Sequence, residues 1–217
     1  MKTIRIAGAS GYWGDSMMAT AQFLKSSKPD YIVYDFLAEI TMSIMARARA
    51  AKPEAGYATD FVVGALKPNL KDIAAQGVKI ISNAGGVNPL ACAQAVEALI
   101  AEQGLDLSVA VITGDDILEQ KAALGKMGIT DMFSNASFPP EDDLVSLNAY
   151  LGAFPIAQAL DQGADIVITG RCVDSAVTLG PCIYEFGWTA EDYDLLAAGS
   201  LAGHIIECGP QATGGNF

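Results

Sequence analysis

The sequence predicts an α/β fold of three layers, with a mostly parallel sheet between two layers of helices. Three observations lead to this prediction. Apolar runs of strand length alternate along the chain with amphipathic stretches of helix length. The apolar runs are nearly continuous, as expected for strands that are covered on both faces. The chain has 217 residues, of which 51% are hydrophobic, and this is enough to bury the core of one large domain.

Five strands are expected, at residues 3–8, 31–36, 78–82, 107–114 and 165–170. The helices between them have recognisable ends. Gly77 is placed to end one helix, and Asn88 followed by Pro89 is typical of the start of the next. Thr189 and Asp192 have the spacing of a capping box. The alternation of strands and helices predicts a Rossmann-like sheet with helices on both faces.

The polar, turn-rich segment 125–143 interrupts this alternation. Long irregular segments within compact domains are often functional, so we expect either a lid over the site or a surface insertion. The whole of 1–217 is expected to form a single α/β domain. The glycine-rich end CGPQATGGNF is followed by no helix or strand, and we interpret the chain as the N-terminal part of a longer one.

Composition disfavours two classes of partner. The formal net charge is −12, from 13 basic and 25 acidic residues, and this argues against nucleic acid and anionic membranes. No apolar run reaches the roughly 18 residues of a membrane-spanning helix, and the N-terminal MKTIRIAG is strand-like rather than a signal peptide. The four cysteines are widely spread without a C-x-x-C pair, which predicts reduced thiols in a cytoplasmic protein.

Unusual polar residues follow every predicted strand. In an open parallel sheet, ligands bind beyond the carboxyl ends of the strands. The five strand ends lead into the segments GASGYWGDS, DFLAE, NAGGVNP, TGDD and TGRCVDSA. Because these ends meet at one edge of the sheet, we expect a functional site there.

The loop after the first strand has the glycine spacing of a dinucleotide-binding turn, at positions Gly8, Gly11 and Gly14. Asp35, at the end of the second strand, stands roughly where a ribose-binding acid is expected. Against this, Asp15 and Ser16 lie where a helix N-terminus would meet the pyrophosphate, and a carboxylate there would compete with the ligand. NAD(P) is therefore the less favoured cofactor, and Asp15 is either a helix cap or part of a substrate site.

The catalytic candidates are Asp35, Glu39 and Cys172. Asp35 and Glu39 are four residues apart and can face the same opening, where paired carboxylates suit acid–base work or metal ligation. The alternative for Glu39 is an ion pair with an arginine such as Arg5 or Arg47. Cys172 follows a cation and precedes a helix, which favours an activated thiolate, although a small buried residue is the alternative.

The substrate-binding candidates share a position at a strand end, and they are Gly11, Asp15, Asn83, Gly85, Gly86, Asn88, Arg171 and Asp174. Backbone amides near Gly85 and Gly86 are expected to stabilise an enolate-like oxyanion. Arg171 is suited to hold a carboxylate, whereas Asp174 could instead cap the next helix. A divalent ion is a further candidate, with Asp15, Asp35 and Asp115 as its ligands. His204, the single histidine, is a structural residue or a base.

The chain resembles the acyclic terpene utilisation family AtuA, formerly described only as a domain of unknown function, in the segments GASGYWGDS, YDFLAEITMSIMARAR, PEAGYATDFV, SNAGGVNP, TGDD, GRCVDSA and GPQATGGNF. The resemblance covers essentially the whole chain, with the motifs in the same order. Family members are longer, and their genes accompany acyl-CoA carboxylation and hydration genes for citronellol and geraniol breakdown. The resemblance implies a cytoplasmic enzyme of branched acyl-CoA or hydroxy-acid catabolism.

Three functions are open on this basis. We expect a lyase or hydratase that acts next to a carbonyl, in which a carboxylate such as Asp35 or Glu39 moves the proton. The first alternative is an NAD(P)-dependent oxidoreductase. The second is a non-catalytic ligand-binding or scaffold subunit, whose polar strand ends would face a partner chain. The expected partners are a small-molecule acyl-CoA or organic acid, and further copies of the chain in a homo-oligomer.

Overall fold

The computed structural model describes residues 2–15 and 17–214, and it confirms the α/β prediction. Its five strands are all parallel and lie in the order β1-β2-β3-β5-β4. They are β1 (Ile6–Ser10), β2 (Tyr31–Tyr34), β3 (Lys79–Ser82), β4 (Val109–Ile112) and β5 (Ile166–Thr169). Each overlaps a predicted strand. The first, however, extends past its predicted end at Gly8 to Ser10, so the loop begins two residues later than expected.

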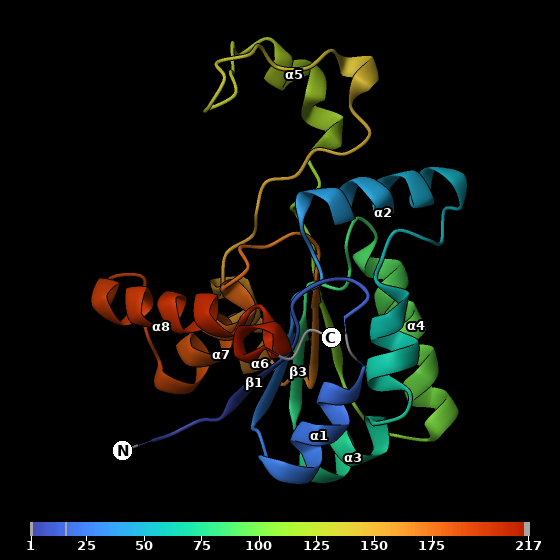
Figure 1. Ribbon diagram of the computed structural model, residues 1–217, viewed down its shortest axis with the longest axis vertical. Coiled ribbons are helices and arrows are strands. Elements are labelled where there is room, and N and C mark those ends of the chain that lie inside the picture. Colours follow the sequence, from blue (N-terminus) through green and yellow to red (C-terminus); the bar gives the residue numbers. More distant parts are fainter. Residues whose placement is uncertain (1, 16, 215–217) are drawn as a thin grey trace.

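One layer of helices covers the face of the sheet to the right in Figure 1. It comprises α1 (Met18–Ser26), the π-helical turn η1 (Phe61–Leu66), α3 (Leu70–Gln76) and α4 (Pro89–Gln103). Successive strand residues point to opposite faces, and on this face Ile32, Ile80 and Ile168 contribute to a core with no exposed side-chain surface. Because hydrophobic burial is roughly proportional to area, this larger of the two cores supplies much of the fold's stability.

The second layer covers the opposite face with α6 (Phe154–Asp161), α7 (Ala176–Phe186) and α8 (Tyr193–Ile206). Here the alternate strand residues Val33, Ile81 and Val167 form the core. The central strands β2 and β5 are buried at every position, whereas β4 at the edge is only half-buried. The prediction of strands covered on both faces is thus confirmed for the centre of the sheet.

The predicted helix ends have clear physical causes. Gly77 adopts the left-handed conformation, with φ 66°, just after α3. The Asn88 side chain accepts a hydrogen bond from Ala91 N at 3.4 Å, and Pro89 occupies the first turn of α4. Asp192 accepts from the amide of Thr189, as in a capping box, but α8 begins only after Asp192. The Thr189–Asp192 contact therefore stabilises the turn that precedes α8, not the first turn of the helix.

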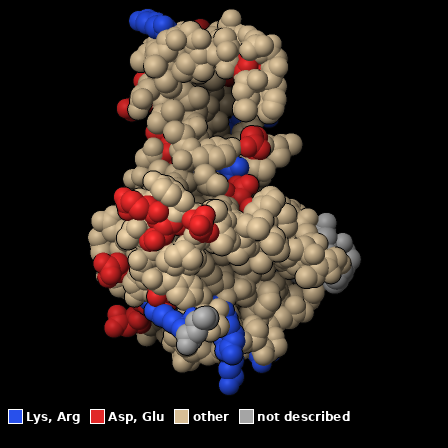
Figure 2. Space-filling view, turned by 90° about the vertical axis from the view of Figure 1, so that its left-hand side faces the viewer, with Lys and Arg blue, Asp and Glu red and all other residues tan. Residues whose placement is uncertain are grey.

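Two features lie beyond the carboxyl edge of the sheet. Helix α2 (Glu39–Ala51) crosses above that edge, and the chain between Ile117 and Leu147 projects past it, as Figure 1 shows. The projection contains η2 (Leu118–Gln120), α5 (Lys121–Gly125) and η3 (Glu141–Asp143), so it exceeds the predicted segment 125–143. Its two ends meet, because the amide of Ile117 donates to the carbonyl of Leu147 at 2.9 Å. Figure 2 shows the molecule narrowing below this projection.

The end of the chain returns to the first strand. The short 3₁₀ helix η4 (Gly209–Thr213) packs beside β1, where the sequence predicted only a glycine-rich turn. The last three residues of that turn, 215–217, lie outside the described part of the chain. Among the helices that the structure describes, none is both long and apolar enough to cross a membrane.

Candidate functional site

The site lies where the sheet changes its direction of winding. The loop after β3 leads to α4 on one face, and the loop after β5 leads to α7 on the other. Between two such neighbouring strands the departing loops leave a crevice, the usual ligand position in open α/β sheets. Asn83 follows β3 and Arg171 follows β5, so both predicted residues stand at this crevice.

Asp35 is the most strongly perturbed acid at this edge. Only 6% of the residue is exposed, and its Oδ1 accepts hydrogen bonds from Asn83 Nδ2 at 2.6 Å and from Leu37 N at 3.2 Å. Burial raises the pKa of Asp35 to about 7, and the hydrogen bond from Asn83 offsets part of that rise. Asn83 itself is fully buried and also accepts from Phe36 N, so it orients Asp35 rather than facing a ligand.

Three carboxyl groups meet at Asp35. One oxygen each of Asp35, Asp174 and Glu207 lies within 4.8 Å of the others. Burial and the charge of Asp174 raise the pKa of Glu207, whereas His204, whose Nδ1 is 3.1 Å from Glu207 Oε1, opposes the rise. Close carboxylates of this kind share protons or bind a cation.

The predicted metal ligands are not brought together as expected. Within the described ranges, Asp35, Asp174 and Glu207 are the one acidic group with this spacing. Asp15 instead accepts from the amide of Gly11 at 2.9 Å. Asp115 accepts from the amide of Arg171 at 2.8 Å and from Asn148 Nδ2 at 2.9 Å. Asp15 therefore stabilises the turn in which it lies, whereas Asp115 links the loop after β4 to Arg171 and Asn148.

Arg171 is a buried cation that links two acids. Its Nη1 donates to Asp174 Oδ1 at 2.5 Å and to the carbonyl of Cys172 at 3.1 Å, and its Nη2 is 3.6 Å from Glu39 Oε1. Burial acts to lower the pKa of Arg171, but the hydrogen bond and charge of Asp174 outweigh it and raise that pKa. The sequence predicted Arg5 or Arg47 as the partner of Glu39. In the structure Glu39 pairs with Arg171 instead.

Cys172 has the wrong environment for an activated thiolate. Its side chain is fully buried, and burial raises the pKa of the thiol to about 12. The cation beside it in sequence is committed to Asp174, so burial dominates. Cys172 therefore fits the alternative of a small buried residue. Ser175 stands at the start of α7 without a capping hydrogen bond from its side chain.

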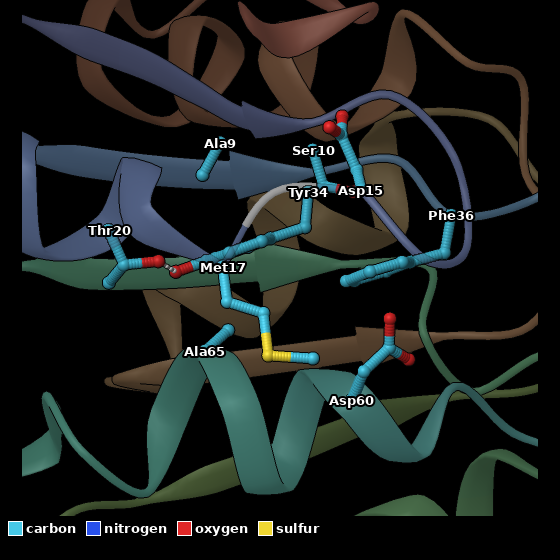
Figure 3. Close-up of a pocket in the computed structure, with 9 residues that line it drawn as sticks. All are labelled: Ala9, Ser10, Asp15, Met17, Thr20, Tyr34, Phe36, Asp60 and Ala65. Carbon is cyan, nitrogen blue, oxygen red and sulfur yellow. Dashed lines mark hydrogen bonds between the residues drawn. The ribbon is translucent and has the colours of Figure 1, made fainter. Parts of the chain in front are cut away.

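The cavity that Asp15 lines beside the glycine loop is too small for a nucleotide. Figure 3 shows the cavity beside it, with Asp15 and Asp60 at opposite edges and the rings of Tyr34 and Phe36 between them. Its volume is about 10 Å³, which is room for at most one water molecule. Ser16, which the sequence placed in this loop, lies outside the described residues.

The first glycines allow the chain to pack against itself. A Cβ atom at Gly8 would lie 2.3 Å from the carbonyl oxygen of Ile206, and one at Gly11 would lie 2.5 Å from that of Cys208. The amide of Gly11 is taken by the Asp15 carboxylate, at the place where a phosphate would bind. This geometry argues against a dinucleotide at the loop and also against a role for Gly11 in substrate binding.

The segment NAGGVNP is likewise committed to internal contacts. The amide of Gly86 donates to Asn83 O, and that of Asn88 donates to Gly85 O at 2.8 Å. A Cβ at Gly85 would lie 2.5 Å from Thr169 O, and one at Gly86 would lie 2.4 Å from the Met45 sulfur. The predicted oxyanion cradle is therefore not supported. Gly86 and Asn88 instead line a separate polar pocket of about 210 Å³ with Arg49, Thr113 and Asp115.

Three residues of the site do not follow the strand-end pattern of the sequence. Tyr150 donates to Glu39 Oε1 at 2.5 Å, and its ring centroid is 4.2 Å from the Arg171 guanidinium carbon. Asn148 donates a hydrogen bond to Asp115, and Glu207 is the third of the close carboxyl groups, with Asp35 and Asp174. None of them comes directly after a strand, so a position at a strand end does not identify them. Tyr150 and Asn148 lie at the base of the projection, and Glu207 follows the last long helix.

These features define a three-layer, parallel α/β protein with an acid-rich polar site at the carboxyl edge of its sheet. Comparison with known families shows which one: the chain belongs to the acyclic terpene utilisation family AtuA, whose model matches residues 4–217. The resemblance drawn from the strand-end motifs is thus confirmed. No curated protein and no solved structure matches the chain.

Proposed function

We propose that this protein is an enzyme of branched acyl-CoA or hydroxy-acid catabolism, a lyase or hydratase in which Asp35 moves a proton next to a carbonyl. Family membership links the chain to acyclic terpene utilisation. The observation that carries the proposal is the state of Asp35: a buried carboxyl, oriented by Asn83, with its pKa raised to about 7. A general base is most effective when its pKa lies near the working pH.

The chemistry follows from this assignment. The Asp35 carboxylate accepts a proton from the carbon next to the carbonyl, and the electron pair moves to the carbonyl oxygen. The enolate then expels a β-hydroxyl, which takes the same proton from Asp35 and leaves as water. The reverse sequence hydrates the double bond, and Asp35 is ionised again at the end of either direction.

The other candidate acid is less suited to this role. The Glu39 side chain is largely exposed, and its hydrogen bond from Tyr150 lowers the pKa of Glu39. A permanently ionised, solvated carboxylate is a weak base toward a carbon acid. The cytoplasmic location and the homo-oligomer stay predictions, as does the small-molecule partner.

The test compares Asp35→Asn with Asp161→Asn, an exposed aspartate outside the site. Hydration of branched 2-enoyl-CoA thioesters and dehydration of the matching 3-hydroxy acids would be followed by the absorbance of the conjugated product. We expect Asp35→Asn to lower kcat by about 10²–10⁴-fold, the usual contribution of a general acid or base. Full activity in Asp35→Asn would overturn the assignment. Activity of the wild type is expected to rise with pH through about 7, as Asp35 ionises.

A further inference from the structure

The guanidinium of Arg171 is hydrogen-bonded at Nη1 and lacks a hydrogen-bond acceptor at Nε. Its side chain is 4% exposed, Nη1 is occupied by Asp174 and by the carbonyl of Cys172, and the Tyr150 ring covers one face. By contrast Nε is buried and has no hydrogen-bond partner among the described residues. A buried donor without an acceptor is rare and costly in folded proteins, so it calls for an explanation.

The unsatisfied donor belongs to the edge that carboxylates recognise. Nε and Nη2 point their N–H groups in the same direction, and a carboxylate can accept from both through its two oxygens. Along this edge Glu39 Oε1 makes one long contact, 3.6 Å from Nη2. Glu39 therefore offsets the charge of Arg171 but does not accept hydrogen bonds from both Nε and Nη2.

The Glu39 side chain can rotate away from Arg171. Its side chain is 81% exposed, and it lies at the first position of α2. Besides Arg171, its partners are the Tyr150 hydroxyl, which donates at 2.5 Å, and its own backbone amide. Rotation of this exposed side chain breaks its contacts with Arg171, with Tyr150 and with its own backbone amide, and moves no part of the core.

We propose that the Nε–Nη2 edge of Arg171, with the Tyr150 hydroxyl, binds the free carboxylate of the ligand, and that Glu39 occupies this subsite as an internal competitor when the ligand is absent. The inference rests on the proposed function, because Asp174 joins Arg171 to the carboxyl group of Asp35. It narrows the substrate class to organic acids with a free carboxylate, in preference to thioesters in which that group is esterified.

The experiment measures binding, not turnover. The probe is 3-methylbutanoate, titrated calorimetrically into the wild type, Glu39→Ala and Glu54→Ala, with its neutral amide as the comparison ligand. Glu54 is a matched control, since it is also an exposed acid with a single ion pair, to Lys52 at 3.3 Å. Both variants change the net charge equally. If Glu39 fills the subsite about nine-tenths of the time, its removal should tighten carboxylate binding about tenfold.

Two outcomes would overturn the proposal. One is a Glu39→Ala affinity for 3-methylbutanoate no higher than that of Glu54→Ala. The other is an equal gain for the neutral amide, which would mean that an apolar surface was uncovered. A second measurement needs no variant of Arg171: its Nε–H resonance in the wild type should move downfield as the carboxylate saturates. An unchanged resonance at saturation would contradict side-on binding.

The failure of this inference is distinguishable from failure of the proposed function. If Asp35→Asn keeps its turnover while Glu39→Ala binds the carboxylate more tightly, the carboxylate subsite at Arg171 is supported and the proton-transfer role of Asp35 is refuted. If Asp35→Asn is inactive while Glu39→Ala binds no better than its control, the base assignment stands and the internal competitor is refuted.

Discussion

At the scale of single residues, burial and hydrogen bonding shift the pKa values of the site's carboxyl groups in opposite directions. For Asp35, burial raises the pKa more than the amide of Asn83 lowers it, and the group titrates near neutrality. For Glu39, exposure removes the burial cost and the Tyr150 hydroxyl lowers the pKa. Two carboxylates four residues apart are thereby given pKa shifts of opposite direction.

The titration of Asp35 predicts a pH-dependent gain in stability for Asp35→Asn. An aspartate in the unfolded chain has a pKa of about 3.9, so between about pH 4 and pH 7 the folded state binds more protons and stability falls as pH rises. The amide variant would lack this loss while keeping an oxygen for Asn83. We expect it to be more stable than wild type by roughly 1–3 kcal/mol at about pH 8, and by much less at about pH 5. Urea unfolding at both values measures this, and a constant difference would contradict it.

The cysteines predict a simple labelling pattern. Cys92, Cys172 and Cys182 are buried, whereas Cys208 is exposed. Burial also raises the thiol pKa of the first two to about 12, so little thiolate forms at neutral pH. An aromatic disulfide reagent should modify one thiol rapidly in the native protein and all four after denaturation. Rapid native labelling of Cys172 would show that its thiol is accessible and activated.

At the scale of elements, close contact between β1 and the end of the chain fixes the glycine pattern. Strand β1 is an edge strand, and the residues from Ile206 to Gly209 approach its backbone directly. Only a residue without a Cβ fits at Gly8, since the nearest backbone oxygen would be 2.3 Å away. The segment that follows α8 thus protects an edge that would otherwise be free to pair with other chains.

This packing predicts that Gly8→Ala destabilises the fold by about 1–3 kcal/mol, the usual cost of overpacking. The control is Gly152→Ala, because Gly152 is exposed and a Cβ there would have no neighbour within 4 Å. The control should be neutral or slightly stabilising, since alanine restricts the unfolded chain. Thermal unfolding of both variants decides the matter; equal melting temperatures would show that the contact with Ile206 is not tight in solution.

At the scale of the whole molecule, a well-packed body carries a projection with little core of its own. The body contains both hydrophobic clusters, whereas no residue from 118 to 147 is buried. At the tip, Met132 and Phe133 are 81% and 86% exposed. Regions with few buried contacts open at low free energy, so the projection is expected to exchange its amide hydrogens faster than the body.

Removal of the projection should therefore leave the body folded. The ends meet at the Ile117–Leu147 hydrogen bond and at an antiparallel bridge between Asp116 and Asn148. A variant with residues 118–146 replaced by Asn-Gly, a two-residue hairpin turn, should melt within a few degrees of wild type. Loss of turnover in the folded variant would favour a lid, and retained turnover would favour a surface insertion. Loss of the cooperative transition would contradict the expected independence.

Much of the fold and part of the site followed from local pattern. The strands were predictable because buried parallel strands are continuous apolar runs, and Asp35, Asn83 and Arg171 were predictable because they follow such runs. The strand order was not, since it depends on which helices pack on which face. The reason for a glycine at position 8 was not predictable either, because the neighbour that requires it, Ile206, is nearly two hundred residues away in the chain.

The remaining errors share one cause, which is burial. Cys172 has an arginine neighbour in sequence and was expected to ionise, but a fully buried thiol stays neutral. The glycines Gly85 and Gly86 suggested a ligand cradle, but strand β5, α4 and Met45 fill the space above them. Glu207 lies after a helix, where no strand-end rule applies, and only the return of the chain to β1 brings it to Asp174.

The hydrogen bond between Ile117 and Leu147 also indicates where new chain termini can be introduced. New chain termini opened in the turn between Met132 and Asn135 would lie at the tip of a projection whose two ends are already joined at its base by the Ile117–Leu147 hydrogen bond and the Asp116–Asn148 bridge. A circular permutant of this kind, with residues 1 and 217 joined through a flexible linker, would keep all five strands in register. Fused to a pair of fluorophores at those new termini, it would report directly on whether the projection bends when an organic acid arrives at Arg171.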